Sequence, residues 1–409
     1  MVARAPPVRP HLLARGPLAE RANTFLDKAW SKGWLPQPDL DPDALWATAT
    51  KLYGARAEAV EHGGRSEEDV ADFRERLARL CKALDAEANL NPLGKAMAWG
   101  QLSRAVKNRL AFGALWRDRP ELLETPLAPP IIVIGHMRSG TTRIHTLLAA
   151  DPAHSHTRYC DAYHPVPARR GARLGLNRVR AAVELAMLGT LNPWMQSIHP
   201  MTANGVEEEL AWISAALHHS IYESQWHIPT YSGWSETRDP APIYREFTRI
   251  LRTDAASRGV ADLPRVLKVP AFTEDLATLL AQFPDARLVI AHRAHDAVLR
   301  SAVSLAANQM AMQCDTCSLA AIEARWEHKI ALREARMARA LANWQGPVAQ
   351  ARFDDLNADW QSAIARVYTD LAVPLTPQAL AAMRRVMAAS QGGHHHAHAA
   401  QLARFSNTG

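Results

Sequence analysis

A short stretch about a third of the way along the chain combines a cation with two glycines at a spacing suited to binding phosphate. Residues 131–134 are four branched apolar residues and predict a buried parallel strand. A loop from Gly135 to Gly140 follows, and residues 141–150 predict a helix. Such a loop points backbone N–H groups and the helix dipole at an anion. We therefore expect an anion site here that includes Arg138.

The spacing of this loop is that of the nucleotide P-loop, G-x-x-x-x-G-K-[ST], with one departure. Thr141 stands where the P-loop has lysine, and Thr142 follows it. That lysine serves the β- and γ-phosphates of a nucleoside triphosphate. Its replacement argues against ATP or GTP as a phosphoryl donor. A nucleotide kinase or NTPase on the same fold stays open as an alternative.

A second set of polar residues follows two further predicted strands, residues 265–269 and 286–292. Lys268 lies at the end of the first strand, and Arg293 comes directly after the second, with Ser301 eight residues later. In an open parallel sheet, ligands bind outside the carboxyl ends of the strands. We expect these residues beside the loop, where Arg293 and Ser301 could share a second phosphate through charge-assisted hydrogen bonds.

The elements that must position these residues alternate between strand and helix, which predicts a parallel sheet with right-handed crossovers. We expect an α/β, P-loop-like three-layer fold with a central parallel sheet, a helical N-terminal extension and a mainly helical insertion. The expected domains are residues 1–125 for the extension, 126–391 for the α/β domain and 392–409 for a His-rich tail. Within the extension, cap and proline patterns predict helices over 41–61, 67–85 and 92–117, which would cover the sheet or the acceptor cleft.

The stretch 153–235 is the predicted insertion. Prolines and glycines break it into loops, and helices are expected over 172–188 and 207–219. Tryptophans concentrate here and could either line an acceptor pocket or belong to the core. They are Trp194, Trp212, Trp226 and Trp234.

The composition bounds the class of protein. The chain is 48% hydrophobic and 22% charged, which is ordinary for a globular enzyme. Its net charge of +6 fits an anionic ligand and many other basic proteins equally well. Long Lys/Arg blocks are absent, which argues against nucleic acid as the partner. No stretch reaches the roughly 20 apolar residues of a membrane span. The sequence has no secretory pattern and only four cysteines, so we expect a cytoplasmic protein. The sequence does not predict its oligomeric state.

Taken together, residues 135–142 and 293–301 resemble the two cofactor signatures of sulfotransferases. They are most similar to the bacterial and tyrosylprotein-type branch, which has arginine at the loop position that is lysine in cytosolic phenol and steroid enzymes. Residues 266–293 are also similar to that branch, and the likeness extends in pattern order from about residue 90 to about residue 375. Met137 and His295 depart from it, because family members often have proline at both positions.

The resemblance implies 3′-phosphoadenosine 5′-phosphosulfate as the co-substrate and no metal. The loop from Gly135 would hold the 5′-phosphosulfate, and the second signature would hold the 3′-phosphate. Carried over by position, the first set is Arg138, Ser139, Gly140, Thr141 and Thr142, and the second is Arg293 and Ser301. Lys268 matches a family lysine that reaches the bridging oxygen. Arg138 and Lys268 would thus stabilise the charge that grows on the leaving phosphate.

An acidic run, Glu207-Glu208-Glu209, corresponds in order to an acidic motif of that branch. A general base must take the acceptor proton, and Glu207 or Glu208 is the candidate. Acidic residues are also favourable at a helix N-terminus, which is the simpler interpretation. His199 and His227 are alternative bases. The acceptor would be a small molecule with a hydroxyl or amine, and the tryptophans suit a hydrophobic or ring-bearing one.

Three further features carry less weight. Cys314 and Cys317 form a lone C-x-x-C without a second pair at metal spacing. Histidines near the C-terminus, His394 to His396 and His398, could bind metal adventitiously or belong to a tail that covers the nucleotide. One face of a long predicted helix is basic and is expected to be solvated; it carries Arg325, Lys329, Arg333 and Arg336. A non-catalytic nucleotide-binding module is the alternative from another class.

Overall fold

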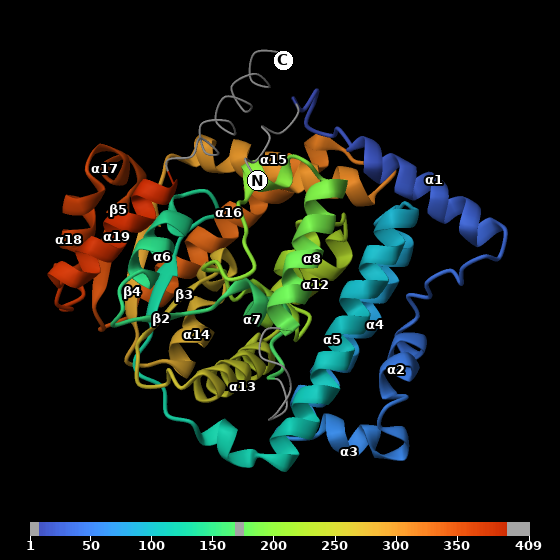
Figure 1. The fold of residues 1–409 in the computed structure, drawn as a ribbon, viewed down its shortest axis with the longest axis horizontal. Coiled ribbons are helices and arrows are strands. Elements are labelled where there is room, and N and C mark those ends of the chain that lie inside the picture. The colour runs from blue at the N-terminus through green and yellow to red at the C-terminus, as the bar shows by residue number, and fades with distance from the viewer. Residues whose placement is uncertain (1–7, 168–175, 391–409) are drawn as a thin grey trace.

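The structure, a computed structural model, describes residues 8–167 and 176–390 (Figure 1). Five parallel strands form one sheet in the order β2-β3-β1-β4-β5. Their bounds are β1 Ile131–Ile134, β2 Ser155–His156, β3 Arg265–Lys268, β4 Arg287–His292 and β5 Val348–Arg352. The strands predicted from sequence are present, and the two-residue β2 was not expected. The predicted His-rich tail lies outside the described residues.

The sheet is the middle of three layers, as predicted. Because alternate side chains of a strand point to opposite faces, β1 divides its four buried residues between two cores. Ile132 and Ile134 pack with α13 (Ala241–Arg258) and α14 (Leu276–Gln282). On the other face, Ile131 and Val133 pack with α6 (Thr141–Ala149), α18 (Trp360–Asp370) and α19 (Pro377–Ser390). Burial on both faces explains why the strand is continuously apolar.

The register of the sheet places the predicted chemistry at one edge. Val133 of β1 pairs with Lys268 of β3 on one side and with Val289 of β4 on the other. The carboxyl ends of these three central strands therefore lie next to one another. The loop after β1, the end of β3 and the segment after β4 share that edge, as the topology rule predicts.

Helices α1 to α5 lie on the opposite side of the molecule from α17 (Phe353–Ala358), α18 and α19 (Figure 1). Their bounds are α1 Pro17–Ser31, α2 Pro42–Thr50, η1 Gly54–Arg56, α3 Ala57–Glu61, α4 Glu67–Ala86, α5 Pro92–Asp118 and η2 Pro120–Glu124. Ser66 and Asn91 cap α4 and α5, which begin where the cap patterns predicted helices. The single helix predicted over 41–61 is wrong, because the chain turns after Thr50 and Gly54 takes a left-handed conformation.

Apart from β2, the described residues between 153 and 235 form helices and loops. The helices are α7 Tyr159–Tyr163, α8 Leu176–Leu191, α9 Met195–Ile198, α10 Leu210–Ser214, α11 His219–Glu223 and α12 Pro229–Thr237. The helix predicted over 207–219 is wrong: Glu207 and Glu208 lie in a loop, and Leu217 adopts a positive φ that separates α10 from α11. Helices α11 and α12 share a hydrophobic core with α2, α4 and α5.

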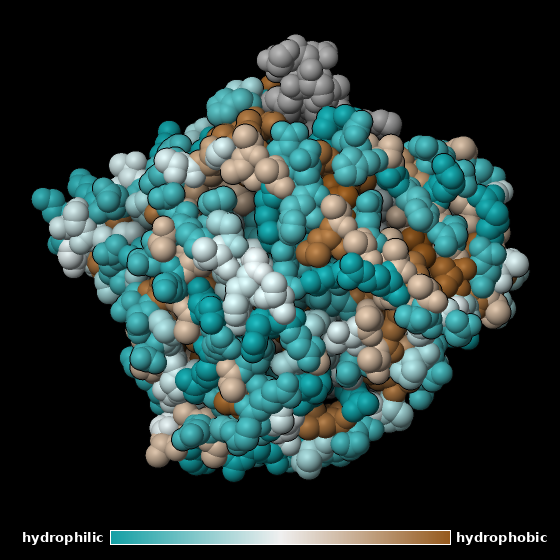
Figure 2. Space-filling view, turned by 180° about the vertical axis from the view of Figure 1, so that it is seen from behind, coloured by the Kyte–Doolittle hydropathy of each residue, from teal (hydrophilic) through white to brown (hydrophobic). Residues whose placement is uncertain are grey.

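Three further helical segments follow β3 and β4 in the chain. They are η3 Pro270–Thr273, α15 His295–Gln313 and α16 Leu319–Ala342. Seen from behind, the surface is mainly hydrophilic with scattered hydrophobic patches (Figure 2). Over the described ranges, no helix has both the length and the apolar character needed to cross a bilayer.

Candidate active site

The loop between β1 and α6 holds an unusual backbone conformation. Gly135, Arg138 and Gly140 have φ angles of +134°, +70° and +93°. A Cβ atom on Gly135 would lie 2.7 Å from the carbonyl oxygen of Ala291, so this position accommodates only glycine. A positive φ is unfavourable for a residue with a side chain, so the contacts around the loop must hold Arg138 in this conformation.

Thr273 ties this loop to the next strand connection. Its hydroxyl accepts a hydrogen bond from the backbone N–H of Gly135 at 3.1 Å. Thr273 does not cap α14, which begins three residues later, but faces Gly135 instead. Inside the loop, the buried Ser139 hydroxyl donates to the carbonyl of His136 at 2.6 Å. Both contacts hold the loop between its two glycines.

The structure brings the two predicted anion-binding signatures together. Arg138 donates from Nε to the hydroxyl of Ser301 at 2.9 Å and from Nη1 to the carbonyl of Ile198 at 2.9 Å. Arg293 donates to the carbonyl of Arg138 at 2.6 Å and stacks over the ring of Phe353. Burial and the charge of Arg293 both lower the pKa of Arg138. Two adjacent guanidinium groups that repel each other would be stabilised by an anion.

Lys268 lies at the carboxyl end of β3 with only 1% of its surface exposed. Its ammonium contacts the carboxylate of Glu208 and donates to the hydroxyl of Thr142 at 3.3 Å. The Thr142 hydroxyl belongs to the first turn of α6, and Thr141 beside it is buried. A buried cation therefore lies directly at the helix N-terminus that the loop opens.

The acidic run after Val206 contributes three carboxylates with different partners. Glu207 lies 3.5 Å from Nε2 of His199 and accepts the backbone N–H of Glu208 at 3.0 Å. Burial alone would lower the pKa of His199, but Glu207 and Glu208 raise it overall. Burial would conversely raise the pKa of Glu207, yet His199 and Lys268 lower it. The two residues therefore favour a charged pair.

Glu209 was not singled out from the sequence, but it is completely buried behind Lys268. Its carboxylate accepts the backbone N–H of Lys268 at 2.9 Å. Burial raises the pKa of Glu209 to about 7. Glu209 binds the main chain of Lys268 rather than its ammonium. It therefore helps to position the end of β3, from which the Lys268 side chain extends. Sequence spacing cannot distinguish this role from those of its two neighbours.

These residues open onto a cavity of about 320 Å³. Arg138, Thr142, His199, Glu207, Glu208 and Lys268 line one part of it. The other walls are mainly apolar and include Met97, Tyr159, Tyr163, Leu188, Met195, Met201, Leu305 and Trp326. Helix α5 of the N-terminal layer contributes Met97 and Gln101, so that layer forms part of the cavity wall as well as covering the fold.

The four tryptophans of residues 153–235 do not line the cavity. Trp194, Trp212 and Trp226 are buried in hydrophobic clusters, and Trp234 packs against one. The core interpretation is therefore correct for them, whereas the aromatic lining comes from tyrosines and from Trp326. His227 is exposed and lies outside the cavity lining, which leaves His199 as the histidine near the carboxylates.

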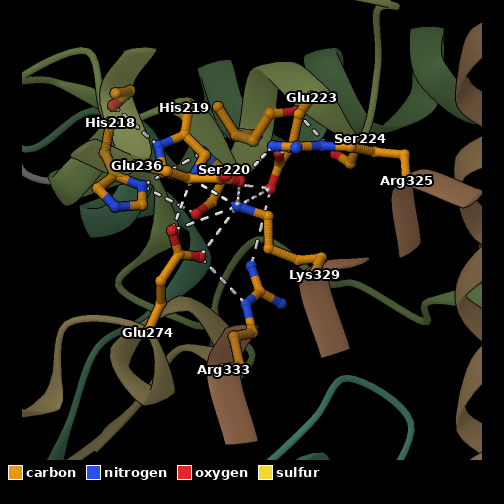
Figure 3. A network of polar contacts seen from close by, with 12 residues as sticks. His218, His219, Ser220, Glu223, Ser224, Glu236, Glu274, Arg325, Lys329 and Arg333 are labelled. Atoms are coloured by element: carbon orange, nitrogen blue, oxygen red, sulfur yellow. Dashed lines mark hydrogen bonds and ion pairs between the residues drawn. The ribbon is translucent and has the colours of Figure 1, made fainter. Parts of the chain in front are cut away.

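A second buried polar cluster lies on α16, and it overturns the prediction of a solvated basic face. Lys329 and Arg333 are 1% and 2% exposed. Their side chains point at carboxylates from three other segments, as Figure 3 shows. The carboxylates are those of Glu223, Glu236 and Glu274. Helical spacing alone does not reveal what a charged face packs against.

His219, Glu223 and Glu236 bring one potential metal-ligand atom each within 4.8 Å of one another. However, the ammonium of Lys329 lies among them, 2.9 Å from Nε2 of His219 and 2.5 Å from Oε1 of Glu236. Lys329 thus supplies the positive charge that a metal ion would bring. Cys314 and Cys317 are free cysteines that lie next to each other between α15 and α16.

The comparisons with known proteins agree with this geometry. The sequence matches the model of the sulfotransferase family over residues 129–377. The structure is similar to that of sulfotransferase STF1 from Mycobacterium tuberculosis H37Rv, with 29% identity and a TM-score of 0.74 over 84% of this chain and 92% of that one. It shares its fold with sulfotransferase STF9 from Mycobacterium avium, at 23% identity and a TM-score of 0.75 over 86% and 89%. No curated protein matches the sequence.

Proposed function

The chain belongs to the sulfotransferase family, and we propose that it transfers a sulfuryl group from 3′-phosphoadenosine 5′-phosphosulfate to a hydroxyl or amine of a small, mainly apolar acceptor. The observation that carries the proposal is the convergence of Arg138, Ser301 and Arg293 beside a glycine-bounded loop, with Lys268 at the same sheet edge. Two anion sites and a buried cation fit a donor with two separated phosphate groups.

The donor residues fall into two groups under this proposal. Loop N–H groups and Arg138, with Ser139, Gly140, Thr141 and Thr142, would hold the 5′-phosphosulfate. Arg293 and Ser301 would hold the 3′-phosphate. Arg138 contacts Ser301 directly, so the guanidinium would connect the two sites. The donor supplies an activated sulfuryl group, and these residues bind and orient it.

Charge stabilisation is the main catalytic contribution that the chain can make. Sulfuryl transfer breaks the bond between sulfur and the bridging phosphate oxygen and forms one between sulfur and the acceptor atom. Negative charge grows on the leaving phosphate, where a preorganised cation and N–H donors in a buried site are most effective. Lys268 and Arg138 are positioned to provide it, and Thr142 helps to fix the Lys268 ammonium.

The acceptor proton must leave as the new bond forms. The Glu208 carboxylate is already bound to the Lys268 ammonium. We therefore assign the role of general base to Glu207, which is paired with His199 and also lines the cavity. Glu208→Gln would then affect the position of Lys268, whereas Glu207→Gln would remove the base and flatten the acidic limb of the pH–rate profile. If only Glu208→Gln changed that limb, Glu208 would be the base.

The cavity supports an apolar acceptor. Methionines, leucines and aromatic rings form much of its wall, and the polar residues beyond the Lys268 region, such as Gln101 and Gln225, are mostly uncharged. Two charged side chains elsewhere in the lining already have partners: Arg104 pairs with Glu184, and Arg333 pairs with Glu274. A neutral, ring-bearing or aliphatic alcohol or amine fits these walls better than a highly charged one.

Calorimetry with 3′,5′-bisphosphoadenosine tests the donor assignment, and labelled-sulfate transfer to a panel of neutral acceptors tests the reaction. We expect binding that Arg293→Ala and Ser301→Ala weaken, whereas Arg366→Ala, an exposed site on α18, leaves it unchanged. Binding of ATP in place of the bisphosphate would favour the kinase or NTPase alternative. Bisphosphate binding without transfer to any acceptor would favour a non-catalytic module.

A further inference from the structure

One serine in the cavity wall differs from the others there in what its hydroxyl binds. Among the described residues, Ser214, Ser220 and Ser224 line the cavity. Ser214 and Ser224 donate to backbone carbonyls of the preceding helical turn, each at 2.7 Å, which is ordinary for serine in a helix. The Ser220 hydroxyl instead lies 2.8 Å from Nδ1 of the His218 imidazole. Its hydroxyl is therefore in contact with a base.

A buried carboxylate lies on the other side of that imidazole. Nε2 of His218 is 2.9 Å from Oδ2 of Asp275. The hydroxyl of Tyr244 donates to the same carboxylate oxygen at 3.3 Å, and Arg336 lies 3.6 Å from the other oxygen. Asp275 is thus held in place by two further side chains. Ser220, His218 and Asp275 form a continuous chain of hydroxyl, imidazole and carboxylate.

The positions of the protons in this chain follow from the donors around the imidazole. An ionised carboxylate only accepts hydrogen bonds, so Nε2 of His218 carries the proton that Asp275 receives. Nδ1 then carries a lone pair, which accepts the backbone N–H of Ser220 at 3.2 Å as well as its hydroxyl. The backbone contact makes His218 the cap of α11, a role that needs neither the hydroxyl nor Asp275. In this tautomer a histidine can take a proton from a serine.

The three residues differ in how they face the cavity. Only Ser220 belongs to its lining, whereas His218 and Asp275 are buried behind it. Figure 3 shows His218 and Ser220 next to the buried cluster around Lys329. A molecule in the cavity would therefore meet the hydroxyl, while the base and the carboxylate stay covered by protein. Nucleophilic serines are arranged in this way.

We propose that Ser220, His218 and Asp275 form a second catalytic centre, which hydrolyses uncharged carboxylic esters bound in the cavity. Oγ of Ser220 bonds to the carbonyl carbon as its proton passes to Nδ1 of His218, and Asp275 stabilises the imidazolium. The bond from that carbon to the leaving oxygen breaks, and His218 gives the proton to the departing alcohol. Water then attacks the acyl-serine with the same proton transfers, which releases a carboxylic acid and restores Ser220.

The surroundings of Ser220 suit an uncharged ester. Ile221 follows it in the lining, and Trp326 contributes an aromatic wall from α16. Arg333 also lines the cavity, and its guanidinium pairs with the carboxylate that precedes Asp275 in the chain. A cation near that aspartate can stabilise the negative charge that develops on the carbonyl oxygen. The proposal does not depend on sulfuryl transfer, which uses a different part of the wall.

Hydrolysis of p-nitrophenyl butyrate by the full chain, followed as release of p-nitrophenolate, tests the proposal. We expect a rate above that of buffer, which Ser220→Ala lowers by about a hundredfold or more. Asp275→Asn should lower it by a similar factor, because an amide can donate to Nε2 and so favour the wrong tautomer of His218. Ser224→Ala is the matched control in the same wall and should keep the wild-type rate.

An alkyl fluorophosphonate gives a second readout that needs no turnover. Its phosphorus bonds to Oγ of Ser220, fluoride leaves, and the serine proton passes to His218. Mass measurement and peptide mapping of the wild-type chain should find the label on Ser220, and Ser220→Ala should remain unlabelled. Thermal unfolding of each variant establishes that its fold is intact.

Three results would overturn the proposal. They are equal hydrolysis by the wild type and Ser220→Ala, an equal loss of hydrolysis in the Ser224→Ala control, and absence of the label from Ser220. Hydrolysis and labelling at Ser220 in a protein that transfers sulfate to no acceptor would support this centre and count against the proposed sulfuryl transfer.

Discussion

Two buried lysines in this molecule differ in how many acceptors surround the ammonium group. Lys268 and Lys329 are each 1% exposed. Lys268 has one carboxylate partner, Glu208, and one hydroxyl, and it faces the cavity. Lys329 has three carboxylates and the Nε2 atom of His219 around its ammonium, as Figure 3 shows. Burial is the same for both, so it does not distinguish a binding residue from a structural one.

The difference lies in how many partners the protein provides. An ammonium has three donors, and the surroundings of Lys329 supply at least four acceptors, which leaves nothing for a ligand. The ammonium of Lys268 has a donor to spare on the cavity side. A buried cation with incomplete protein partners is available to stabilise charge that appears during a reaction. The following predictions test whether this distinction separates catalysis from stability.

The largest expected effect is on folding, from Lys329→Met. This substitution leaves three buried carboxylates without their shared cation and should lower the free energy of unfolding by about 3 to 5 kcal/mol. Denaturant titration measures it, and Lys51→Met, at an exposed lysine, serves as the control. A change no larger than that of the control would show that the cluster contributes little to stability.

Lys268→Met should act mainly on the reaction. Loss of the cation at the leaving group should lower kcat by about 10² to 10³, with a smaller loss of stability than for Lys329→Met. Steady-state kinetics at saturating donor and bisphosphate calorimetry measure the two effects. The double variant Lys268→Met/Glu208→Gln controls for the unpaired carboxylate and should be equally inactive. Retention of kcat in either variant would contradict the catalytic assignment.

The Lys329 cluster should make the fold sensitive to acid. Burial and Lys329 lower the pKa of His219 to about 4, so the folded state stays unprotonated where the unfolded imidazole, near 6.5, binds a proton. The stability from His219 is complete above pH 6.5 and is lost as the pH falls through 4. Burial would raise the pKa of Glu223, but Lys329, His219 and Arg325 lower it to about 2, which extends the loss below pH 4.5.

Denaturant midpoints measured from pH 8 to pH 3 should therefore fall steadily, by an amount on the order of 2 to 3 kcal/mol through His219 alone. His219→Gln should remove most of the loss of stability that the wild type shows between pH 6.5 and pH 4. A flat profile in the wild type over that range would mean that His219 is already protonated in the fold.

The smallest expected effect comes from the pair His199 and Glu207 in the cavity wall. Its contribution to stability changes with pH in the opposite direction to that of His219. Glu207 raises the pKa of His199 above its ordinary value of 6.5 despite burial. The stability gained from this pair is complete below pH 6.5 and is lost as the pH rises through the folded pKa. His199→Gln should thus cost stability at pH 6 and progressively less at higher pH. A cost that grows with pH would contradict the pairing with Glu207.

Local patterns were sufficient to predict the loop after β1 and its place beside the ends of β3 and β4. The apolar run at residues 131–134 and the glycines that follow it determine strand, loop and helix within a few residues of sequence. The topology rule then places Lys268 and Arg293 at the same edge, because parallel strands end together. The helix caps Ser66 and Asn91 were predictable for the same reason, since a cap acts on its own first turn.

Features that depend on distant partners could not be predicted. The α16 face that carries Lys329 has the spacing of a solvated surface, and only the fold brings Glu223, Glu236 and Glu274 against it. Likewise, the Thr273 hydroxyl could cap a helix or bond a loop, and the packing of η3 beside β1 decides in favour of Gly135. Sequence periodicity fixes the direction of a side chain but not the partner that it meets.

The strand order also affects how the chain can fold during synthesis. β1 is the central strand, yet its pairing partners in β3 and β4 begin about 135 and 155 positions later, as the Ile131–Val266 and Ile131–Arg287 pairs show. At ribosomal rates of about 5 to 20 residues per second, the synthesis of β3 follows that of β1 by roughly 7 to 27 seconds, and that of β4 by roughly 8 to 31 seconds. The four branched apolar residues of β1 have no strand partner during that time, whereas α4 and α5 can form from contacts between neighbouring residues. Nascent chains stalled before residue 265 should therefore depend on chaperones more than completed ones.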